Sequence, residues 1–356
     1  FNRFEQKAFA DENEPLLTLE QRAIYSTIID AVILAKAGNG KTFTEKVIAA
    51  RLHGNGRVVL TVTSTGIAAL QLPGGWTAHS MFKLPLEDNV VQGALCNIRG
   101  ESQRAELIRN CDLIIWDELP MTHKYCVEAL NKTLQDLLNN DSVFGGKCIL
   151  FSGDWRQVGP IVKYGSASDT VEAAVISSFL WTSITRLHLT ASQRDKEDEQ
   201  FASFVRAVEE NRQPTVHMFN GDMVALSNTG NNSTSAHFTL RYTTDFEDLV
   251  KFVYPDLNED TYLMHDRAIL ATTNTAIDAA NKDIAERRSQ NPISFFSSDS
   301  LISDESNPYT AFAAPEHLNL LNAQGVLPHE LVLRSNDLAM LTRNLNFGEG
   351  LVNGQK

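Results

Sequence analysis

The sequence predicts an α/β fold in which buried parallel strands end in polar loops at one edge of a sheet. Three short apolar runs, at 32–34, 113–116 and 148–151, lead respectively into a glycine-containing loop at 35–40, the carboxylates of Asp117 and Glu118, and the polar segment 152–157. A strand that is buried on both faces has a continuous apolar sequence, and parallel sheets bind ligands beyond the carboxyl ends of their strands. We therefore expect one ligand-binding edge formed by three strand-to-loop transitions.

The composition is that of a globular protein with room for two domains. The 356 residues are 43% hydrophobic and 21% charged, and a chain of this size can bury two cores. No apolar stretch approaches the roughly 20 residues that span a bilayer, and no signal-peptide pattern opens the sequence. The four scattered cysteines favour a reducing compartment over a zinc site or disulfide framework. We therefore expect no membrane partner and an intracellular location: nucleus or mitochondrion in a eukaryote, cytoplasm in a bacterium.

The first transition has the sequence of a phosphate-binding loop. Residues 35–42 read Ala-Lys-Ala-Gly-Asn-Gly-Lys-Thr. Small residues let successive backbone N–H groups surround phosphate oxygens, and the following helix adds its positive N-terminal end. The alternative is a Gly-rich turn before an ordinary helix, but strand, loop and helix follow in the order that a nucleoside triphosphate site requires. The residues expected to bind the nucleotide here are Ala37, Gly38, Asn39, Gly40, Lys41, Thr42 and Phe43, with Lys41 on the outer phosphates and Thr42 on Mg²⁺.

The second and third transitions add the groups that hydrolysis needs. Asp117 would hold Mg²⁺ through water, and Glu118 would orient or deprotonate the attacking water. An Asp-Glu pair alone is usually a solvated turn, but together with the upstream loop it predicts the metal and base site of an NTPase. The segment 152–157 after the third strand carries polar groups that can sense the γ-phosphate.

Hydrophobic periodicity predicts the remaining elements. Thr18 is the expected N-cap of the first helix. The segment 83–104 has no clear period and is expected to be a small insertion, whereas 227–235 should be a loop and 295–307 mobile. Helices are expected at 18–32, 43–52, 67–72, 122–138, 200–210 and 275–287, and further strands at 58–63, 184–189, 268–271, 337–341 and near 351.

The order of these motifs resembles the petite-integration-frequency (PIF) family of superfamily 1B DNA helicases, which includes the helicase parts of Helitron-type transposons. The most specific segments are 64–69, 72–82 and 153–160, with further matches at 327–331 and 350–354. The resemblance implies an α/β protein with two RecA-like P-loop NTPase domains and parallel sheets. The expected domains are 1–195, with the ATP site and a wedge insertion at 83–104, and 196–356, which is incomplete and ends at the start of an SH3-like insertion.

The resemblance also implies a monomeric motor that uses ATP and Mg²⁺ to move 5′ to 3′ on single-stranded DNA and at single-strand/duplex junctions. By matching position, Gln21 would read the adenine edge, Gln157 would sense the γ-phosphate, and Arg194 would act like an arginine finger. The alternatives are a solvated helix residue for Gln21 and a surface charge for Arg194. The expected catalytic set is Lys41, Asp117, Glu118, Gln157 and Arg194.

The expected DNA-binding residues carry groups that hold phosphates or stack on bases without reading sequence. Phe82 could equally be a core residue. The formal net charge of −13 is unusual for a polyanion binder, so we expect modest non-specific affinity and strong salt sensitivity. The set is Ser64, Thr65, Thr77, His79, Ser80 and Phe82 in the first domain, and Thr273 and Asn274 in the second.

The family continues after the segment 350–354 with an SH3-like module, a Ser-Gln-Gly motif and an arginine-bearing motif, none of which is in this sequence. We therefore expect the chain to be part of a longer protein. The leading hypothesis is an ATP-dependent 5′-to-3′ DNA helicase. The alternatives are an ATP- and DNA-binding fragment without turnover of its own, the helicase part of a Helitron-type transposase, and a P-loop ATPase that acts on protein. The residues do not choose among DNA repair, recombination, telomere maintenance and transposition.

Overall fold

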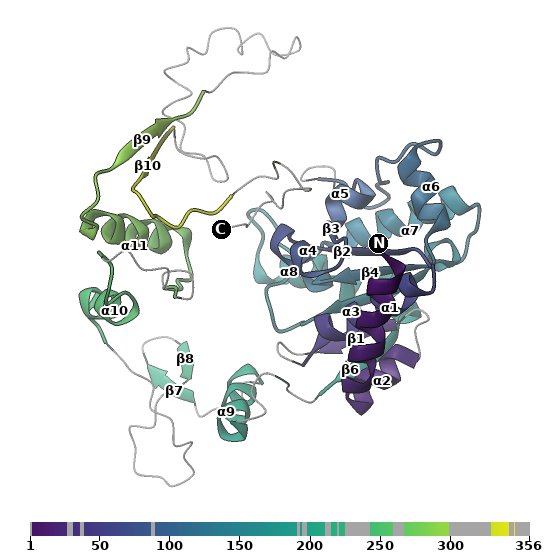
Figure 1. Ribbon diagram of the computed structural model, residues 1–356, viewed down its shortest axis with the longest axis horizontal. Helices are drawn as coiled ribbons and strands as arrows, with labels where there is room; N and C mark the ends of the chain where they lie inside the picture. Colours follow the sequence, from purple (N-terminus) through teal and green to yellow (C-terminus); the bar gives the residue numbers. More distant parts are fainter. Residues whose placement is uncertain are drawn as a thin grey trace. The chain divides into compact units, whose positions relative to one another are not determined.

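The chain divides into two compact units (Figure 1). The first comprises Phe1–Leu240 with Leu341–Gln355, and the second comprises Arg241–Met340 with Lys356. The computed structural model describes residues 2–26, 31–35, 39–86, 90–190, 193, 198–210, 215–218, 221–224, 243–258, 267–298, 329–341 and 345.

The first unit is built on a six-stranded sheet in the order β3-β2-β4-β5-β1-β6. Every neighbouring pair is parallel, so the carboxyl ends of all six strands lie at the same edge, as predicted. The strands are β1 (Ala31–Ala35), β2 (Val59–Thr63), β3 (Trp76–Thr77), β4 (Leu113–Asp117), β5 (Cys148–Gly153) and β6 (Thr185–Leu189).

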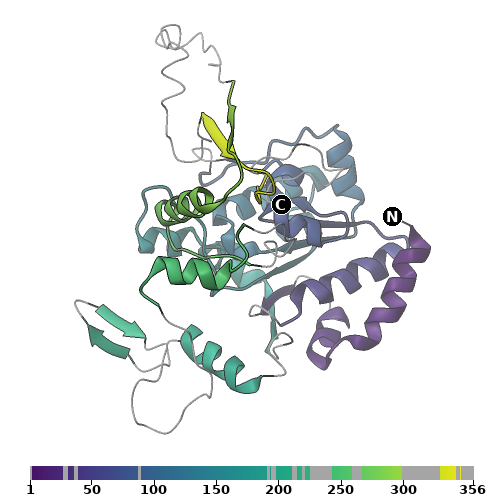
Figure 2. The same cartoon turned by 60° about the vertical axis from the view of Figure 1, so that its left-hand side comes forward.

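Helices cover both faces of this sheet, which explains the continuous apolar strand sequences. Along β4, Leu113 and Ile115 belong to the core that contains Ile48 of α3 (Lys41–Gly54) and Ile24 of α2 (Leu19–Ser26). Ile114 and Trp116 belong to the opposite core, with side chains of α6 (Gln103–Asn110) and α7 (Lys124–Leu138). Successive strand residues point to opposite faces, so both sets must be apolar. On the outside, α1 (Arg3–Asn13) packs beside α3 (Figure 2).

The second unit carries two helices and a short ribbon in its described part. The antiparallel ribbon pairs β9 with β10. No helix in the described part of the chain combines the length and the hydropathy that crossing a membrane requires. The elements of the second unit are α10 (Phe246–Val253), α11 (Asn274–Arg287), β9 (Ile293–Phe296) and β10 (Glu330–Leu333).

The first unit contains further short elements besides the sheet and the helices named above. They are η1 (Glu14–Leu16), α4 (Gly66–Gln71), α5 (Ala78–Phe82), η3 (Leu119–Met121), η4 (Val143–Gly146), α8 (Ala167–Ala173), η5 (Val175–Ser177), η6 (Phe179–Ser183), α9 (Glu199–Glu209), β7 (Thr215–Met218) and β8 (Gly221–Val224).

Several predicted element boundaries are wrong. The helix predicted to reach residue 32 ends at Ser26, because Ala31 already belongs to β1. Residues 268–271 form no strand, and Leu270 is 91% exposed. Among the described residues no strand pairs with this run, and an unpaired apolar segment has no sheet to join.

Near the C-terminus the predicted and observed strands also differ. Residues 337–341 are not a strand, since the pairing partner of β9 is the earlier segment β10. Phe295 and Phe296, predicted to be mobile, belong to β9. The loop predicted at 227–235 and the strand near 351 lie outside the described residues.

Candidate functional site

The carboxyl ends of β1, β5 and β4 bring three predicted site segments together. β5 lies between the other two strands, with Leu34 of β1 beside Gly153 and Trp116 of β4 beside Phe151. The loop before α3, the acidic pair after β4 and the segment 152–157 therefore share one edge of the sheet. Of the predicted site residues, Ala37, Gly38 and Arg194 lie outside the described residues.

The described part of the phosphate loop is anchored on both sides. Gly40, the N-cap of α3, has φ of 83°, and a Cβ there would lie 2.3 Å from Nε2 of Gln21. A side chain at this position would meet both backbone strain and a clash. The Asn39 side-chain amide donates to the carbonyl of Leu189 at the end of β6, at 2.5 Å. These contacts fix the loop where Lys41, Thr42 and Phe43 begin α3.

Gln21 is 2% exposed, so its interpretation as a solvated helix residue is wrong. Its backbone N–H donates to Thr18 Oγ1 at 3.2 Å, and its Oε1 accepts from the Thr18 N–H at 2.9 Å. This reciprocal pair is a capping box, which confirms Thr18 as the N-cap of α2. The Gln21 Nε2 donates to the carbonyls of Asn39 and Gly40 at 3.5 and 3.4 Å. Gln21 thus ties α2 to the loop, and adenine recognition by its amide stays a prediction.

Buried Asp117 ends β4, and half-buried Glu118 follows it and is hydrogen-bonded to it. Asp117 is 4% exposed, and its Oδ1 accepts from Ser152 Oγ at 2.6 Å and from the Glu118 N–H at 2.8 Å. Burial raises the pKa of Glu118, and the Asp117 carboxylate raises it further, while Lys41 opposes both effects. A carboxyl with a raised pKa is a better general base near neutral pH than an ordinary one.

The end of β5 approaches this acidic pair closely. A Cβ on Gly153 would lie 2.1 Å from Cδ of Pro120 in η3. Glycine is therefore required for the Ser152 hydroxyl to reach Asp117 while η3 packs on the same strand end. Sequence reasoning placed Ser152 only among the polar groups of 152–157 that could sense the γ-phosphate and did not predict its bond to Asp117, although a hydroxyl that directly follows the apolar run of the neighbouring strand was a usable signal.

Glu45 of α3 is a second residue that sequence reasoning missed. It is fully buried, and neither carboxyl oxygen has a hydrogen-bond partner among the described residues. Burial raises its pKa well above the usual range, and Asp117 adds to this, whereas Ser152 and Lys41 lower it. Its spacing was the available signal, because a residue four positions after Lys41 shares its helix face.

The raised pKa of Glu45 predicts a pH-dependent loss of stability in the nucleotide-free protein. The native state binds this proton more tightly than the unfolded state, so stability falls as the pH rises from about 4.5 through the folded pKa. At pH 8 the Glu45→Gln variant should exceed the native protein in unfolding free energy by about 1–3 kcal/mol, with a smaller difference at pH 5. Urea unfolding in EDTA at both pH values measures this. The control Glu106→Gln replaces an exposed carboxyl and should change the unfolding free energy by less than about 0.5 kcal/mol, and equal behaviour of the two variants would contradict the prediction.

The residues at this edge fit a magnesium ion that arrives with a nucleotide. Thr42 offers a hydroxyl, and Oδ2 of Asp117 accepts no hydrogen bond among the described residues. Both are hard oxygen ligands of the kind Mg²⁺ prefers. No group of three or more His, Cys, Asp or Glu in the described part could hold a metal alone. Mg²⁺ commonly completes its shell with substrate phosphates and water, which agrees with this sparse set.

Gln157 is exposed, and its backbone N–H donates to the carbonyl of Asp154 at 3.1 Å. The adjacent Arg156 pairs with Glu210 at 3.3 Å, immediately after α9. The segment is thus held at the sheet edge by its backbone and by its arginine. Contact of Gln157 with a γ-phosphate stays a prediction.

Three of the predicted DNA-binding residues are helix N-caps. The hydroxyls of Thr65, Thr77 and Thr273 each accept a backbone N–H three residues ahead, at 3.3 Å, and begin α4, α5 and α11. A hydroxyl that accepts this bond still has its proton to donate, for example to a phosphate oxygen. Thr65 follows β2 and Thr77 ends the neighbouring strand β3 at the sheet edge, whereas Thr273 and Asn274 belong to the second unit.

His79 and Ser80 lie half-buried in α5. Burial lowers the pKa of His79, which favours the neutral ring over the charged one. Arg104 Nη1 donates to the carbonyls of Ser80 and Met81, at 2.5 and 2.6 Å. The guanidinium therefore holds the end of α5 in place.

Phe82 is a core residue, and its interpretation as a base-stacking ring is wrong. The side chain is fully buried, and its ring centroid lies 5.8 Å from that of Trp116 on the inner face of β4. A ring enclosed by the core cannot offer a face to a nucleotide. The sequence of the predicted DNA-binding segment 72–82 did not show that Phe82 is buried in the core.

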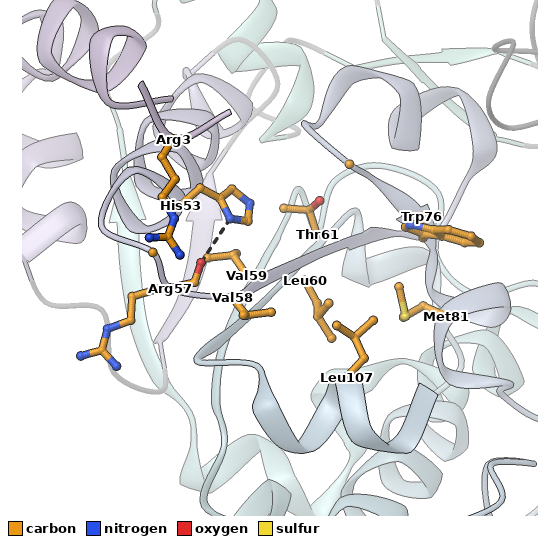
Figure 3. A pocket seen from close by; sticks show the side chains of 12 residues that line it. Arg3, His53, Arg57, Val58, Val59, Leu60, Thr61, Trp76, Met81 and Leu107 are labelled. Atoms are coloured by element: carbon orange, nitrogen blue, oxygen red, sulfur yellow. Dashed lines mark hydrogen bonds between the residues drawn. The ribbon is translucent and has the colours of Figure 1, made fainter. Parts of the chain in front are cut away.

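A hollow of about 440 Å³ borders the first half of β2, away from the carboxyl ends of the strands (Figure 3). His53 Nδ1 donates to the carbonyl of Arg57 at its rim, at 3.3 Å. Because the predicted ligand groups all follow the strand ends, this hollow is separate from the candidate site. Its lining is Arg3, His53, Gly56, Arg57, Val58, Val59, Leu60, Thr61, Gly74, Trp76, Met81 and Leu107.

The parallel sheet, the glycine loop between β1 and α3 and the acidic pair at the end of β4 define a P-loop NTPase fold of the RecA-like type. A family model described as PIF1-like helicase matches residues 16–226, and one described as DNA helicase Pif1, 2B domain, matches residues 316–356. The chain belongs to the PIF1-like helicase family.

Curated relatives agree with this assignment. The ATP-dependent DNA helicase Pif1 of Psychrobacter sp. is 26% identical over 176 residues, which cover 49% of this chain and 27% of the relative. The ATP-dependent DNA helicase PIF1 of Candida albicans is 27% identical over 210 residues, which cover 56% of this chain and 23% of the relative. The matches thus span about a quarter of the length of these relatives.

Solved structures show the same fold. The crystal structure of Pif1 helicase from Candida albicans matches with a TM-score of 0.62 and 21% identity, covering 95% of this chain and 67% of that one. Bacteroides Pif1 bound to single-stranded DNA matches with a TM-score of 0.60 and 18% identity, covering 95% of this chain and 68% of that one. At these identities the likeness concerns the fold.

Proposed function

We propose that this chain is the motor part of an ATP-dependent DNA helicase that translocates 5′ to 3′ on single-stranded DNA and unwinds duplex. The observation that carries the proposal is the shared sheet edge. The nucleotide segments follow β1, β4 and β5, and hydroxyl groups lie in the loop after the adjoining strand β2 and at the end of β3. One rigid sheet thus presents both sets of groups. Family membership supports the proposal, as do similar proteins whose structures hold single-stranded DNA or ADP-AlF3.

In the proposed mechanism Lys41 binds the outer phosphates, and Glu118 orients or deprotonates the attacking water. Mg²⁺, held by Thr42 and Asp117, would neutralise developing phosphate charge. Gln157 and Arg194 contact the γ-phosphate and report its loss, and Gln21 contacts the adenine. Thr65, Thr77, His79 and Ser80, together with Thr273 and Asn274, hold the DNA backbone through hydroxyl, amide and backbone N–H groups.

Unwinding polarity tests the proposal directly. The full-length protein is given duplexes that carry either a 5′ or a 3′ single-stranded tail, with ATP and Mg²⁺, and strand separation is followed by fluorescence. We expect unwinding of the 5′-tailed substrate, and hydrolysis that single-stranded DNA stimulates. Unwinding that prefers the 3′ tail would contradict the polarity. Hydrolysis that is indifferent to DNA even at low salt would favour a protein substrate.

A further inference from the structure

Ser64 joins the loop after β2 to the turn that carries Glu118. Its Oγ donates to the carbonyl of Glu118 at 2.6 Å and lies 3.0 Å from Oγ1 of Thr122. A serine hydroxyl has one proton. Because that proton goes to Glu118, the Thr122 hydroxyl must be the donor toward Ser64. The three groups form a chain that runs from Thr122 through Ser64 to Glu118.

The backbone of Glu118 needs such support. Glu118 has φ of 55° and ψ of 39°, in the left-handed region that non-glycine residues rarely adopt. Its N–H donates to Asp117 Oδ1 at 2.8 Å, and its carbonyl accepts the Ser64 hydroxyl. A longer bond from the Met121 N–H, at 3.4 Å, ends on the same carbonyl. Side chains on both sides therefore hold the peptide units from which the Glu118 carboxyl projects.

The other end of this link is a loop with a proposed DNA contact. Thr63 pairs with Asp117 in the sheet, so Ser64 and Glu118 leave neighbouring strands at equivalent positions. Thr63 Oγ1 donates to the Thr65 carbonyl at 2.7 Å, and Thr65 in turn caps α4. A shift of the Thr65 backbone therefore moves Ser64 and, through its hydroxyl, the Glu118 turn.

We propose that Ser64 is a positioning residue that couples the loop after β2 to the geometry of Glu118. The inference rests on the proposed function, and it reassigns the Ser64 hydroxyl. That group serves the hydrolytic site through Glu118, while Thr65, whose hydroxyl accepts the α4 cap bond and keeps its own proton to donate, is the hydroxyl of this loop proposed to contact DNA.

The test compares Ser64→Ala with Ser64→Thr and with Thr61→Val in the full-length protein. Thr61 is the matched control, because it also donates a buried hydroxyl of β2 to a backbone carbonyl, that of Pro73 at 2.9 Å. Ser64→Ala should lower kcat for DNA-stimulated hydrolysis by about five- to tenfold, the effect of one lost hydrogen bond on the reaction barrier. KM for ATP and the affinity for single-stranded DNA should change by less than about twofold. Ser64→Thr should restore kcat, and Thr61→Val should leave it near the native value.

Three outcomes would overturn the inference: an unchanged kcat in Ser64→Ala, an equal loss in Thr61→Val, or a loss confined to DNA affinity. If DNA fails to stimulate the native protein, the proposed function fails instead. In that case the inference about Ser64 is tested by the rate of ATP hydrolysis without DNA, because that reaction also depends on Glu118. An unaltered basal kcat in Ser64→Ala would refute it.

Discussion

The Lys41→Ala variant should lose DNA-stimulated ATP hydrolysis by at least about a hundredfold, and up to about a thousandfold. This is the loss typical of removing one preorganised group from a developing negative charge. Lys41 is 8% exposed at the start of α3. Because its side chain is buried, a solvent-exposed lysine nearby cannot take over its role. Its charge also lowers the pKa of both Glu45 and Glu118, so its removal should raise both values further. A steady-state hydrolysis assay with and without single-stranded DNA measures the loss.

Lys46→Ala is the matched control for this variant. Lys46 lies on the same helix and is more exposed than Lys41. Its replacement removes one positive charge from α3 and should leave turnover within about twofold of the native protein, as expected for a site outside the machinery. DNA-stimulated hydrolysis that survives in Lys41→Ala, or that is lost equally in Lys46→Ala, would show that the loop has been assigned wrongly.

The Phe82→Ala variant should destabilise the first unit by about 3–5 kcal/mol. This is the usual result of emptying a buried phenylalanine site, because the surrounding core collapses only in part. The ring lies against Trp116 at the centre of the sheet face covered by α6 and α7. Urea unfolding of the nucleotide-free protein measures the change. Phe82→Leu, which keeps most of the volume, should lose less than about 1.5 kcal/mol.

DNA binding separates this packing role from base stacking. Below its unfolding temperature, Phe82→Ala should bind single-stranded DNA nearly as well as the native protein. A base-stacking ring would instead contribute about 1–3 kcal/mol of binding energy and little stability. Phe4→Ala is a suitable control, since Phe4 is 87% exposed on α1 and its loss should change stability by less than about 0.5 kcal/mol. Weak DNA binding with unchanged stability in Phe82→Ala would restore the stacking interpretation.

Local pattern was sufficient for five strands of the first unit's sheet, all but β3, and for the polar segments that follow β1, β4 and β5. The apolar runs of β4 and β5 are continuous because both faces are covered, and the capping box joins Thr18 to Gln21, only three positions later. The strand predicted at 268–271 failed because apolar composition does not supply a partner strand. Pairing is a non-local property, so a segment with strand composition stays unpaired when no neighbour presents its backbone.

The amino-acid order alone was enough for the α/β class, for the glycine-rich and acidic segments after two of the strands, and for Thr18 as the N-cap of α2, because each depends on contacts within a few residues. The hydrogen-bonding and packing partners of the site residues were revealed only by the tertiary structure. Ser152 reaches Asp117 across 35 positions, Ser64 reaches Glu118 across 54, and Phe82 meets Trp116 inside the core. Such contacts arise from the order of strands in the sheet and from the face on which each side chain falls. Strand order and side-chain face are set by how distant segments pack together, so the sequence of a single segment does not predict them.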